Sequence, residues 1–395
     1  MSYLIFCSFE VGAFPYMMAE TLNRHGVKAY YISLAGSCSG HNSTKFHYGE
    51  TCDEWDLSLL FNKQESARKN IRLLRDIKSR YGIERSFATG GKSYLLKEAE
   101  IDYKYWSFGS DLDIWCKFPV VPDGFLLWKK AMLYPYFLLT VCRDYKKSVF
   151  DASSLLIGPH QLASYQRVCP RKRLFFVSHL TNVAGPYERI SGQKKENKNE
   201  ICKKIGAEKF FFSSARHVWA DKKDTNAHIK GNDVMLYSFA RYLKLSGDKK
   251  TKLVLIRKGP DVALSEKLAQ ELLINDYIVW LDEMQRDEIL PYYQGALLCL
   301  GQFGTPALCY GTLESLANAT PCISFFNRWD AKTPFYETVP PVFNSKNPEE
   351  IADFMWRLSL DEKYSSELSY KSWLWARENC SEEKFVETFL KEMQR

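Results

Sequence analysis

Residues 301–317 combine residue types and spacing that would let a protein hold a nucleotide. They read as the end of a strand, a loop with glycines and a helix that carries an acid, Glu314, in its first turn. Glycines let the backbone approach a ligand that a Cβ would repel, and the start of a helix presents N–H groups and a partial positive charge to phosphate. A nearby carboxylate can accept hydrogen bonds from ribose hydroxyls. The alternative is an ordinary helix in which Glu314 only complements the helix dipole.

The segments around this stretch alternate between strand and helix patterns. Apolar runs predict strands over 209–213, 252–256, 278–281, 296–300 and 321–325, and helical periodicity falls between them over 233–243, 263–273, 286–294 and 313–318. This alternation predicts a doubly wound parallel sheet. Ligands of such sheets bind at the carboxyl ends of the strands, and the stretch 301–317 begins at one of these ends.

The first half of the chain shows the same α/β alternation. Strands are predicted over 3–9, 27–34, 104–108, 155–157 and 174–177, and helices over 16–24, 70–81 and 127–139. Between residues 185 and 199 the chain is polar and lacks apolar periodicity, which is typical of a linker. We therefore expect one domain over residues 1–188, a second over 189–372, and a C-terminal helix over 373–395.

Composition restricts the class of protein and its partners. The 395 residues include 54 basic and 47 acidic side chains, a net charge of +7, which favours anionic partners. No recognisable nucleic-acid module accompanies the charge, and no His, Cys or carboxylate cluster predicts a metal. The start of the chain has no secretory signal pattern, so a cytoplasmic location is expected. The basic clusters at 68–80 and 171–173 are either peripheral membrane contacts or solvated surface.

Five segments in the second half resemble the GT-B glycosyltransferases, in particular the large retaining class called family 4. Most of the likeness lies between Lys209 and Phe325, and a weaker match in the first half is the Gly-Ser-Asp-Leu turn that contains Asp111. The matching segments, in chain order, are 213–216, 230–233, 258–261, 302–304 and 310–323. The resemblance implies two Rossmann-like doubly wound domains that face each other across a cleft, with the C-terminal helix returning to the first domain.

The resemblance also implies an activity, which is the transfer of a sugar from a nucleotide-diphosphate sugar to a saccharide acceptor, without a metal or other cofactor. A UDP- or GDP-sugar is the expected donor, and polysaccharide or glycan synthesis the expected role. Arg216 and Lys230 would neutralise the departing diphosphate, Glu314 would hold the ribose, and Asp111 would orient or deprotonate the acceptor. The remaining donor-binding residues would be Gly12, Gly304, Tyr310, Gly311, Thr312 and Leu313.

Each of these roles has a structural alternative. Arg216 and Lys230 are otherwise surface charges, Asp111 a helix cap, and Gly12 part of an ordinary β–α turn. Lys222 and Lys223 compete with Lys230 for the phosphate.

The chain also departs from the family pattern at two positions. Pro306 stands where the family has the first of two glutamates, and Phe108 stands where a histidine is common. A catalytically silent GT-B-like protein that binds nucleotides or sugars as a scaffold is therefore the alternative function.

Overall fold

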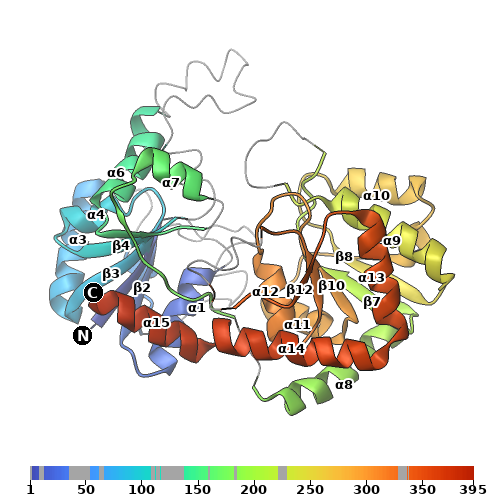
Figure 1. Ribbon diagram of the computed structural model, residues 1–395. Helices are drawn as coiled ribbons and strands as arrows, with labels where there is room; N and C mark the ends of the chain where they lie inside the picture. The colour runs from blue at the N-terminus through green and yellow to red at the C-terminus, as the bar shows by residue number, and fades with distance from the viewer. Residues whose placement is uncertain are drawn as a thin grey trace. The chain divides into compact units, whose positions relative to one another are not determined.

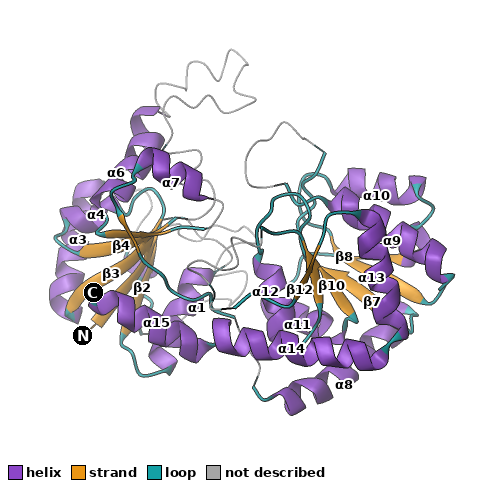
Figure 2. Cartoon of the chain, viewed as in Figure 1, coloured by secondary structure: helices purple, strands orange, loops and turns teal. Residues whose placement is uncertain are grey.

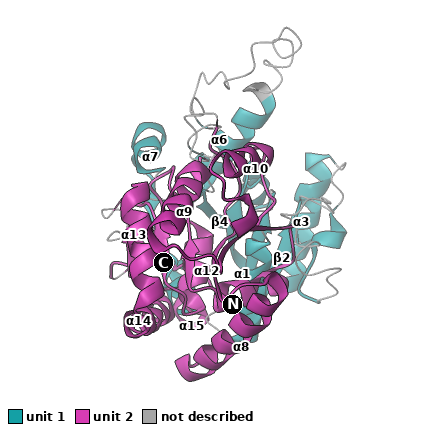
Figure 3. Cartoon of the chain, turned by 90° about the vertical axis from the view of Figure 1, so that its right-hand side faces the viewer, with its two compact units in different colours: residues 1–177, 386–395 teal, residues 178–385 magenta. Residues whose placement is uncertain are grey.

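The chain forms two compact units, and the last ten residues belong to the first of them (Figure 3). Unit 1 contains residues 1–177 and 386–395, and unit 2 contains residues 178–385. The computed structural model describes residues 2–8, 13–34, 54–61, 66–107, 112, 116, 138–158, 161–181, 185–220, 229–327, 336 and 338–395. Compared with the predicted boundaries, the first unit ends eleven residues before 188, and the returning segment starts at 386 instead of 373.

Unit 1 is built on a six-stranded parallel sheet with strand order β2-β1-β3-β4-β5-β6 (Figures 1 and 2). Its strands are β1 (Ser2–Cys7), β2 (Ala29–Ser33), β3 (Ile83–Thr89), β4 (Asp102–Trp106), β5 (Ser154–Leu156) and β6 (Arg173–Leu174). β1 and β2 are buried along their whole length, as expected for strands of a parallel sheet that is covered on both faces.

Helices cover both faces of this sheet, because successive strand residues point to opposite sides. Leu4, Phe6 and Tyr105 pack in one core with Leu74 and Leu96. The helices of this unit are α1 (Phe14–Arg24), α3 (Ala67–Tyr81), α4 (Tyr94–Glu98), α6 (Arg143–Asp151) and α7 (Leu162–Val168), with a 3-10 turn at η1 (Ser58–Leu60) and a π turn at η3 (Leu138–Cys142).

The opposite face of the sheet carries aromatic contacts to α1 and to the last helix, α15 (Glu382–Gln394). The rings of Phe14 and Trp106 lie 5.2 Å apart in an edge-on arrangement. Phe389 of α15 contacts Tyr3 at 5.4 Å and Phe87 at 6.0 Å between ring centroids. The end of the chain is therefore part of the core of unit 1.

Unit 2 has a second six-stranded parallel sheet, with strand order β12-β11-β10-β7-β8-β9. Its strands are β7 (Lys209–Ser213), β8 (Thr251–Ile256), β9 (Ile278–Leu281), β10 (Leu298–Leu300), β11 (Cys322–Ser324) and β12 (Val342–Asn344). The order reverses between β7 and β10, which is the Rossmann arrangement. Both predicted doubly wound α/β domains are thus confirmed.

The helices of unit 2 are divided between the two faces of its sheet (Figure 1). Phe211, Leu253 and Leu300 point to a core shared with Phe239 and Met355, whereas Phe212 points the other way and contacts Tyr293 of α11. The helices are α8 (Tyr187–Ile205), α9 (Asn232–Ser246), α10 (Val262–Glu271), α11 (Arg286–Gly295), α12 (Tyr310–Ala317), α13 (Pro348–Leu360) and α14 (Glu362–Cys380), with a 3-10 turn at η5 (Asn275–Tyr277).

Two sequence expectations are corrected by these elements, and one strand was missed. The polar stretch 185–199 is not a linker, because it lies mostly in α8, an exposed helix that buries Ile190, Ile201 and Cys202. The single helix expected over 373–395 is the end of α14 followed by α15. Strand β3 was not predicted, since Glu84 and Arg85 interrupt its apolar run.

No described helix has the length and apolar character that crossing a bilayer requires.

Candidate functional site

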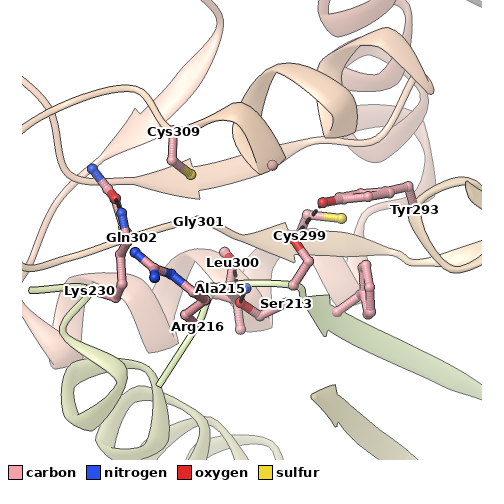
Figure 4. Close-up of a pocket in the computed structure, with 13 residues that line it drawn as sticks. Ser213, Ala215, Arg216, Lys230, Tyr293, Cys299, Leu300, Gly301, Gln302 and Cys309 are labelled. Atoms are coloured by element: carbon pink, nitrogen blue, oxygen red, sulfur yellow. Dashed lines mark hydrogen bonds between the residues drawn. The ribbon is translucent and has the colours of Figure 1, made fainter. Parts of the chain in front are cut away.

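A cavity of about 160 Å³ lies in unit 2 at the carboxyl ends of β7 and β10, where the strand order reverses. This is the place at which open parallel sheets bind ligands. Figure 4 shows its lining, in which Arg216, Lys230 and Gln302 lie at one end, and Tyr293 and Cys299 lie at the other. The lining residues are Phe212, Ser213, Ser214, Ala215, Arg216, Lys230, Tyr293, Cys299, Leu300, Gly301, Gln302, Cys309 and Gly311.

Lys230 is held in place by backbone pairing between the loop before α9 and the loop after β10. The carbonyl oxygen of Lys230 accepts from the amides of Phe303 at 2.7 Å and Gly304 at 3.2 Å. Gly231 has a φ of 68°, and a Cβ there would lie 2.7 Å from the Gly304 nitrogen. A Cβ on Gly304 would in turn meet the backbone of Ile229. Glycine is therefore required at both positions for the loops to touch.

The side chain of Lys230 is partly buried, and its ammonium donates to Gln302 Oε1 at 2.6 Å. Gln302 Nε2 donates to the carbonyl oxygens of Thr305 at 3.1 Å and Ala307 at 2.7 Å, which fixes the orientation of the amide. Burial lowers the pKa of Lys230, and the neighbouring Arg216 lowers it further. An anion in the cavity would oppose both effects.

Arg216 projects from the loop that follows β7, and this loop is tied to the segment before α10. The amides of Trp219 and Ala220 donate to Asp261 Oδ2 at 2.6 and 2.9 Å. The ring of His217 is buried beside Ser265, with Nδ1 2.8 Å from its Oγ, and burial lowers the pKa of His217 to about 4. The exposed guanidinium of Arg216 therefore stands on a rigid base.

No described carboxylate lies within ion-pair distance of Arg216 or Lys230, in contrast to nearby cations such as Lys258, which pairs with Glu283 at 3.0 Å. Two positive charges thus converge on one cavity, with Gln302 as a neutral partner. Such an arrangement favours a bound anion, because charge-assisted hydrogen bonds to phosphate or carboxylate would replace the missing counter-charge.

The start of α12 forms another side of the cavity. Its N-cap is Cys309, and no side chain caps the helix. A Cβ on Gly311 would lie 2.9 Å from Ser214 Oγ and 3.0 Å from the hydroxyl of Tyr293, so glycine allows the helix to approach the loop after β7. Gly301 plays the same part at the strand end, where a Cβ would meet Thr312 Oγ1 at 2.6 Å. The helix terminus therefore faces the same space as the two cations.

Glu314 does not lie in the first turn of its helix, because α12 begins at Tyr310 rather than at 313. Its carboxylate forms an ion pair with Arg286, the first residue of α11, at 3.2 Å, and both side chains are nearly buried. The same guanidinium donates to the Tyr310 hydroxyl at 3.2 Å. Burial raises the pKa of Glu314, while Arg286 and a hydrogen bond from Tyr293 act in the opposite direction. Glu314 therefore does not complement the dipole at the start of α12, as one of the sequence alternatives had it, but takes part in a buried ion pair.

The predicted donor-site residues separate into three groups. Arg216, Lys230 and Gly311 line the cavity together. Gly304, Tyr310 and Glu314 do not line it. Gly304 pairs with the backbone of Lys230, and Tyr310 and Glu314 both contact Arg286. Thr312 and Leu313 are buried within α12. Asp111 and Gly12 lie outside the described residues, as do the rival lysines Lys222 and Lys223.

Sequence reasoning missed Tyr293, which lines the cavity, and Arg286, which pairs with Glu314. The hydroxyl of Tyr293 lies 2.5 Å from Ser214 Oγ. Neither residue belongs to a segment with a motif, so only the fold brings them to Glu314. Among the described residues, no group of three or more His, Cys, Asp or Glu side chains is arranged to hold a metal ion.

Comparison with known proteins identifies the fold. Neither the known protein families nor the curated protein sequences contain a match to this chain. Solved structures do match over the whole chain, at low sequence identity. A glycosyltransferase from Rickettsia africae superposes with a TM-score of 0.63 at 12% identity, covering 100% of this chain and 98% of its own.

Two further solved structures are similar over the whole chain. HepE from Anabaena, in complex with UDP-glucose, has a TM-score of 0.61 at 10% identity and full coverage of both chains. Sucrose-phosphate synthase from Thermosynechococcus elongatus has a TM-score of 0.60 at 12% identity, with 100% of this chain and 98% of that chain covered. The chain therefore has the GT-B fold, as its sequence motifs predict.

Proposed function

We propose that this protein is a glycosyltransferase that takes a sugar from a nucleotide-diphosphate sugar and passes it to a saccharide acceptor. The observation that carries the proposal is the convergence of Lys230 and Arg216 on the cavity in unit 2, with no described carboxylate paired to either. A diphosphate is the group in such a donor that needs two cations.

The reaction explains why fixed cations belong there. Glycosyl transfer passes through a state in which the sugar becomes oxocarbenium-like and negative charge grows on the departing diphosphate. Preorganised donors aimed at that charge contribute several kcal/mol in a site that excludes water. The guanidinium of Arg216 suits a forked contact to two phosphate oxygens, and the ammonium of Lys230 suits a point contact. The uncapped start of α12 adds N–H donors. In this proposal no metal is required.

The nucleoside would extend from the diphosphate toward Glu314 and its partner Arg286. A carboxylate has two oxygens, so Glu314 can keep its ion pair with Arg286 through one of them and accept from a ribose hydroxyl through the other. Arg286 would then be a positioning residue for that carboxylate. The likeness to a UDP-glucose complex makes UDP the first nucleotide to test. Retention at the anomeric carbon, a role in polysaccharide or glycan synthesis, and Asp111 on the acceptor side are the finer parts of the proposal.

The test is nucleotide binding measured by calorimetry with UDP, GDP, ADP and their sugars. We expect one nucleotide to bind, and Arg216→Ala and Lys230→Met each to weaken it by about ten- to a hundredfold, since a hydrogen bond to a charged group contributes about 1.5–3 kcal/mol. Arg241→Ala and Lys244→Met are matched controls, because both side chains are exposed on α9 and do not line the cavity. Wild-type affinity in both cavity variants would refute the assignment.

A silent nucleotide-binding scaffold is the second candidate, and two observations favour it. Pro306 occupies the place of an acid in the family pattern, and Glu314 already has a partner in Arg286. Hydrolysis of the donor sugar without acceptor separates the two functions, because a transferase site that stabilises charge separation leaks some sugar to water. Nucleotide binding without any hydrolysis or transfer, across several donors and acceptors, would favour the scaffold.

A further inference from the structure

A second group of basic side chains surrounds a cavity in unit 1, at the amino-terminal ends of its strands. The cavity has a volume of about 150 Å³ and is lined by residues that include Arg85, Ser86, Asp102, Lys104, Ser153 and Arg395. It shares no residue with the cavity in unit 2. Lys104 is the unusual member, since its side chain is only 5% exposed.

The sheet register shows why Lys104 is buried. Lys104 of β4 is the partner of Phe87 of β3, and partners on neighbouring parallel strands point to the same face. Phe87 contacts Phe389 of α15, so Lys104 also points to the face that α15 covers. Its ammonium lies 5.3 Å from the centre of the Phe175 ring. An apolar side chain would suit this position, and yet the residue there is a lysine.

The charges around Lys104 do not balance. Glu392 of α15 is shared by Arg173 at 3.3 Å and Arg395 at 3.0 Å. Asp102 pairs with Lys97 at 2.8 Å. No described carboxylate lies within 4 Å of the Lys104 ammonium. Arg173, Arg85 and Arg395 act on it with the same sign of charge, and Glu392 acts in the opposite direction.

The remaining nearby guanidinium, that of Arg85, donates to the carbonyl oxygen of Met393. Burial is the largest cause of a lowered pKa at Lys104, and Arg173 is the next. A buried ammonium without a paired charge costs free energy, and replacing such groups by apolar side chains often stabilises a protein. Without a ligand, the buried ammonium therefore lowers the stability of the protein, and a bound anion would offset this loss.

We propose that this cavity binds the phosphate group of a small molecule, with Lys104, Arg85 and Arg395 as its cationic contacts. The cavity is about five times the volume of one water molecule in the liquid, which suits a phosphate or a small phosphomonoester. Arg395 follows directly after α15, so a bound phosphate would tie the end of this helix to strands β3 and β4.

The experiment uses the full chain with Arg216→Ala and Lys230→Met as background, so that phosphate cannot report on the cavity in unit 2. Calorimetry is run with inorganic phosphate and with glycerol 3-phosphate. We expect binding to the background protein and at least a tenfold loss on adding Lys104→Met, since one charged hydrogen-bonding partner is removed. Arg395→Gln is a second variant, because its side chain is half exposed and does not endanger folding. Lys97→Met is the control and should bind as the background does.

A measurement without ligand completes the test. Lys104→Met should raise the melting temperature in phosphate-free buffer, and phosphate should stabilise the background protein but not the Lys104→Met variant. Equal affinity for the two ligands would assign the site to phosphate alone, and tighter binding of glycerol 3-phosphate would assign it to a phosphomonoester. The proposal is overturned if neither ligand binds the background protein, or if Lys104→Met and Arg395→Gln leave binding unchanged.

Discussion

Replacing Arg286 by methionine should destabilise the protein in a strongly pH-dependent way. The variant leaves the carboxylate of Glu314 nearly buried without its partner, which now lies 3.2 Å away. Breaking a buried ion pair from one side costs about 3–5 kcal/mol. Protonation of Glu314 would remove the buried charge. The free energy needed to keep Glu314 protonated therefore sets an upper limit on the loss of stability.

The limit follows from the ordinary pKa of the group, 4.5. Holding a carboxyl protonated costs about 1.36 kcal/mol for each pH unit above its unfolded pKa, which is about 4.8 kcal/mol at pH 8 and about 0.7 kcal/mol at pH 5. Because burial already raises the pKa of Glu314 and Arg286 opposes that rise, removing Arg286 raises the pKa further. A protein that holds a carboxyl with a raised pKa becomes less stable as pH rises. Arg286→Met should therefore lower the free energy of unfolding strongly at pH 8 and only slightly at pH 5.

The assay is urea unfolding at pH 5 and pH 8 for wild type, Arg286→Met and the double variant with Glu314→Gln. The double variant should recover most of the loss at pH 8, since it carries no buried charge. Arg257→Met is a matched control, because its pair with Glu266 at 3.0 Å is partly exposed and should contribute less than about 1 kcal/mol at either pH. A loss at pH 8 that Glu314→Gln does not relieve, or an equal loss at both values of pH, would refute the reasoning.

Two further predictions concern the cavity in unit 2. Nucleotide affinity should fall as pH rises through the lowered pKa of Lys230, which lies below the range in which an ordinary lysine titrates. Lys230→Arg should flatten this dependence in calorimetric titrations between pH 7 and about 9.5. An unchanged profile in Lys230→Arg would contradict the prediction. Gly304→Ala should weaken nucleotide binding at least tenfold, because its Cβ would push against the backbone of Ile229 and displace Lys230. Gly192→Ala is the control, because Gly192 has open space around it in α8. It should leave nucleotide affinity unchanged and stabilise the protein by about 0.5–1 kcal/mol in thermal unfolding.

The sequence was most informative where strands are continuous apolar runs. The predicted strands 209–213 and 278–281 coincide with β7 and β9. β7 is a central strand that is buried from Phe210 to Ser213, whereas β9 is an edge strand that is still apolar along its whole length. Strand β3 lies between β1 and β4 but is not a continuous apolar run. Glu84 and Arg85, near its amino-terminal end, interrupt the pattern. The helix α8 was missed for a related reason, because a helix that buries only three residues shows little periodicity.

The cationic part of the candidate site was visible in the sequence, and its polar support was not. Arg216 and Lys230 follow a strand end and precede a helix, and the fold brings such positions to one edge of the sheet. The partner of Glu314 is 28 positions away on another helix, and no local pattern marks Arg286. Pairings of this kind depend on how helices dock, which periodicity alone does not determine.

The place of α15 in the core of unit 1 has a consequence for how the chain matures during synthesis. Residues 386–395 supply Phe389, which contacts Tyr3 and Phe87, so one face of the amino-terminal sheet is covered only after these residues have left the ribosome. All of unit 2 is translated in between, and contacts of such long sequence separation form slowly. A truncated nascent chain that ends after Val177 would expose an aromatic surface, and it is this species that chaperones would need to shield.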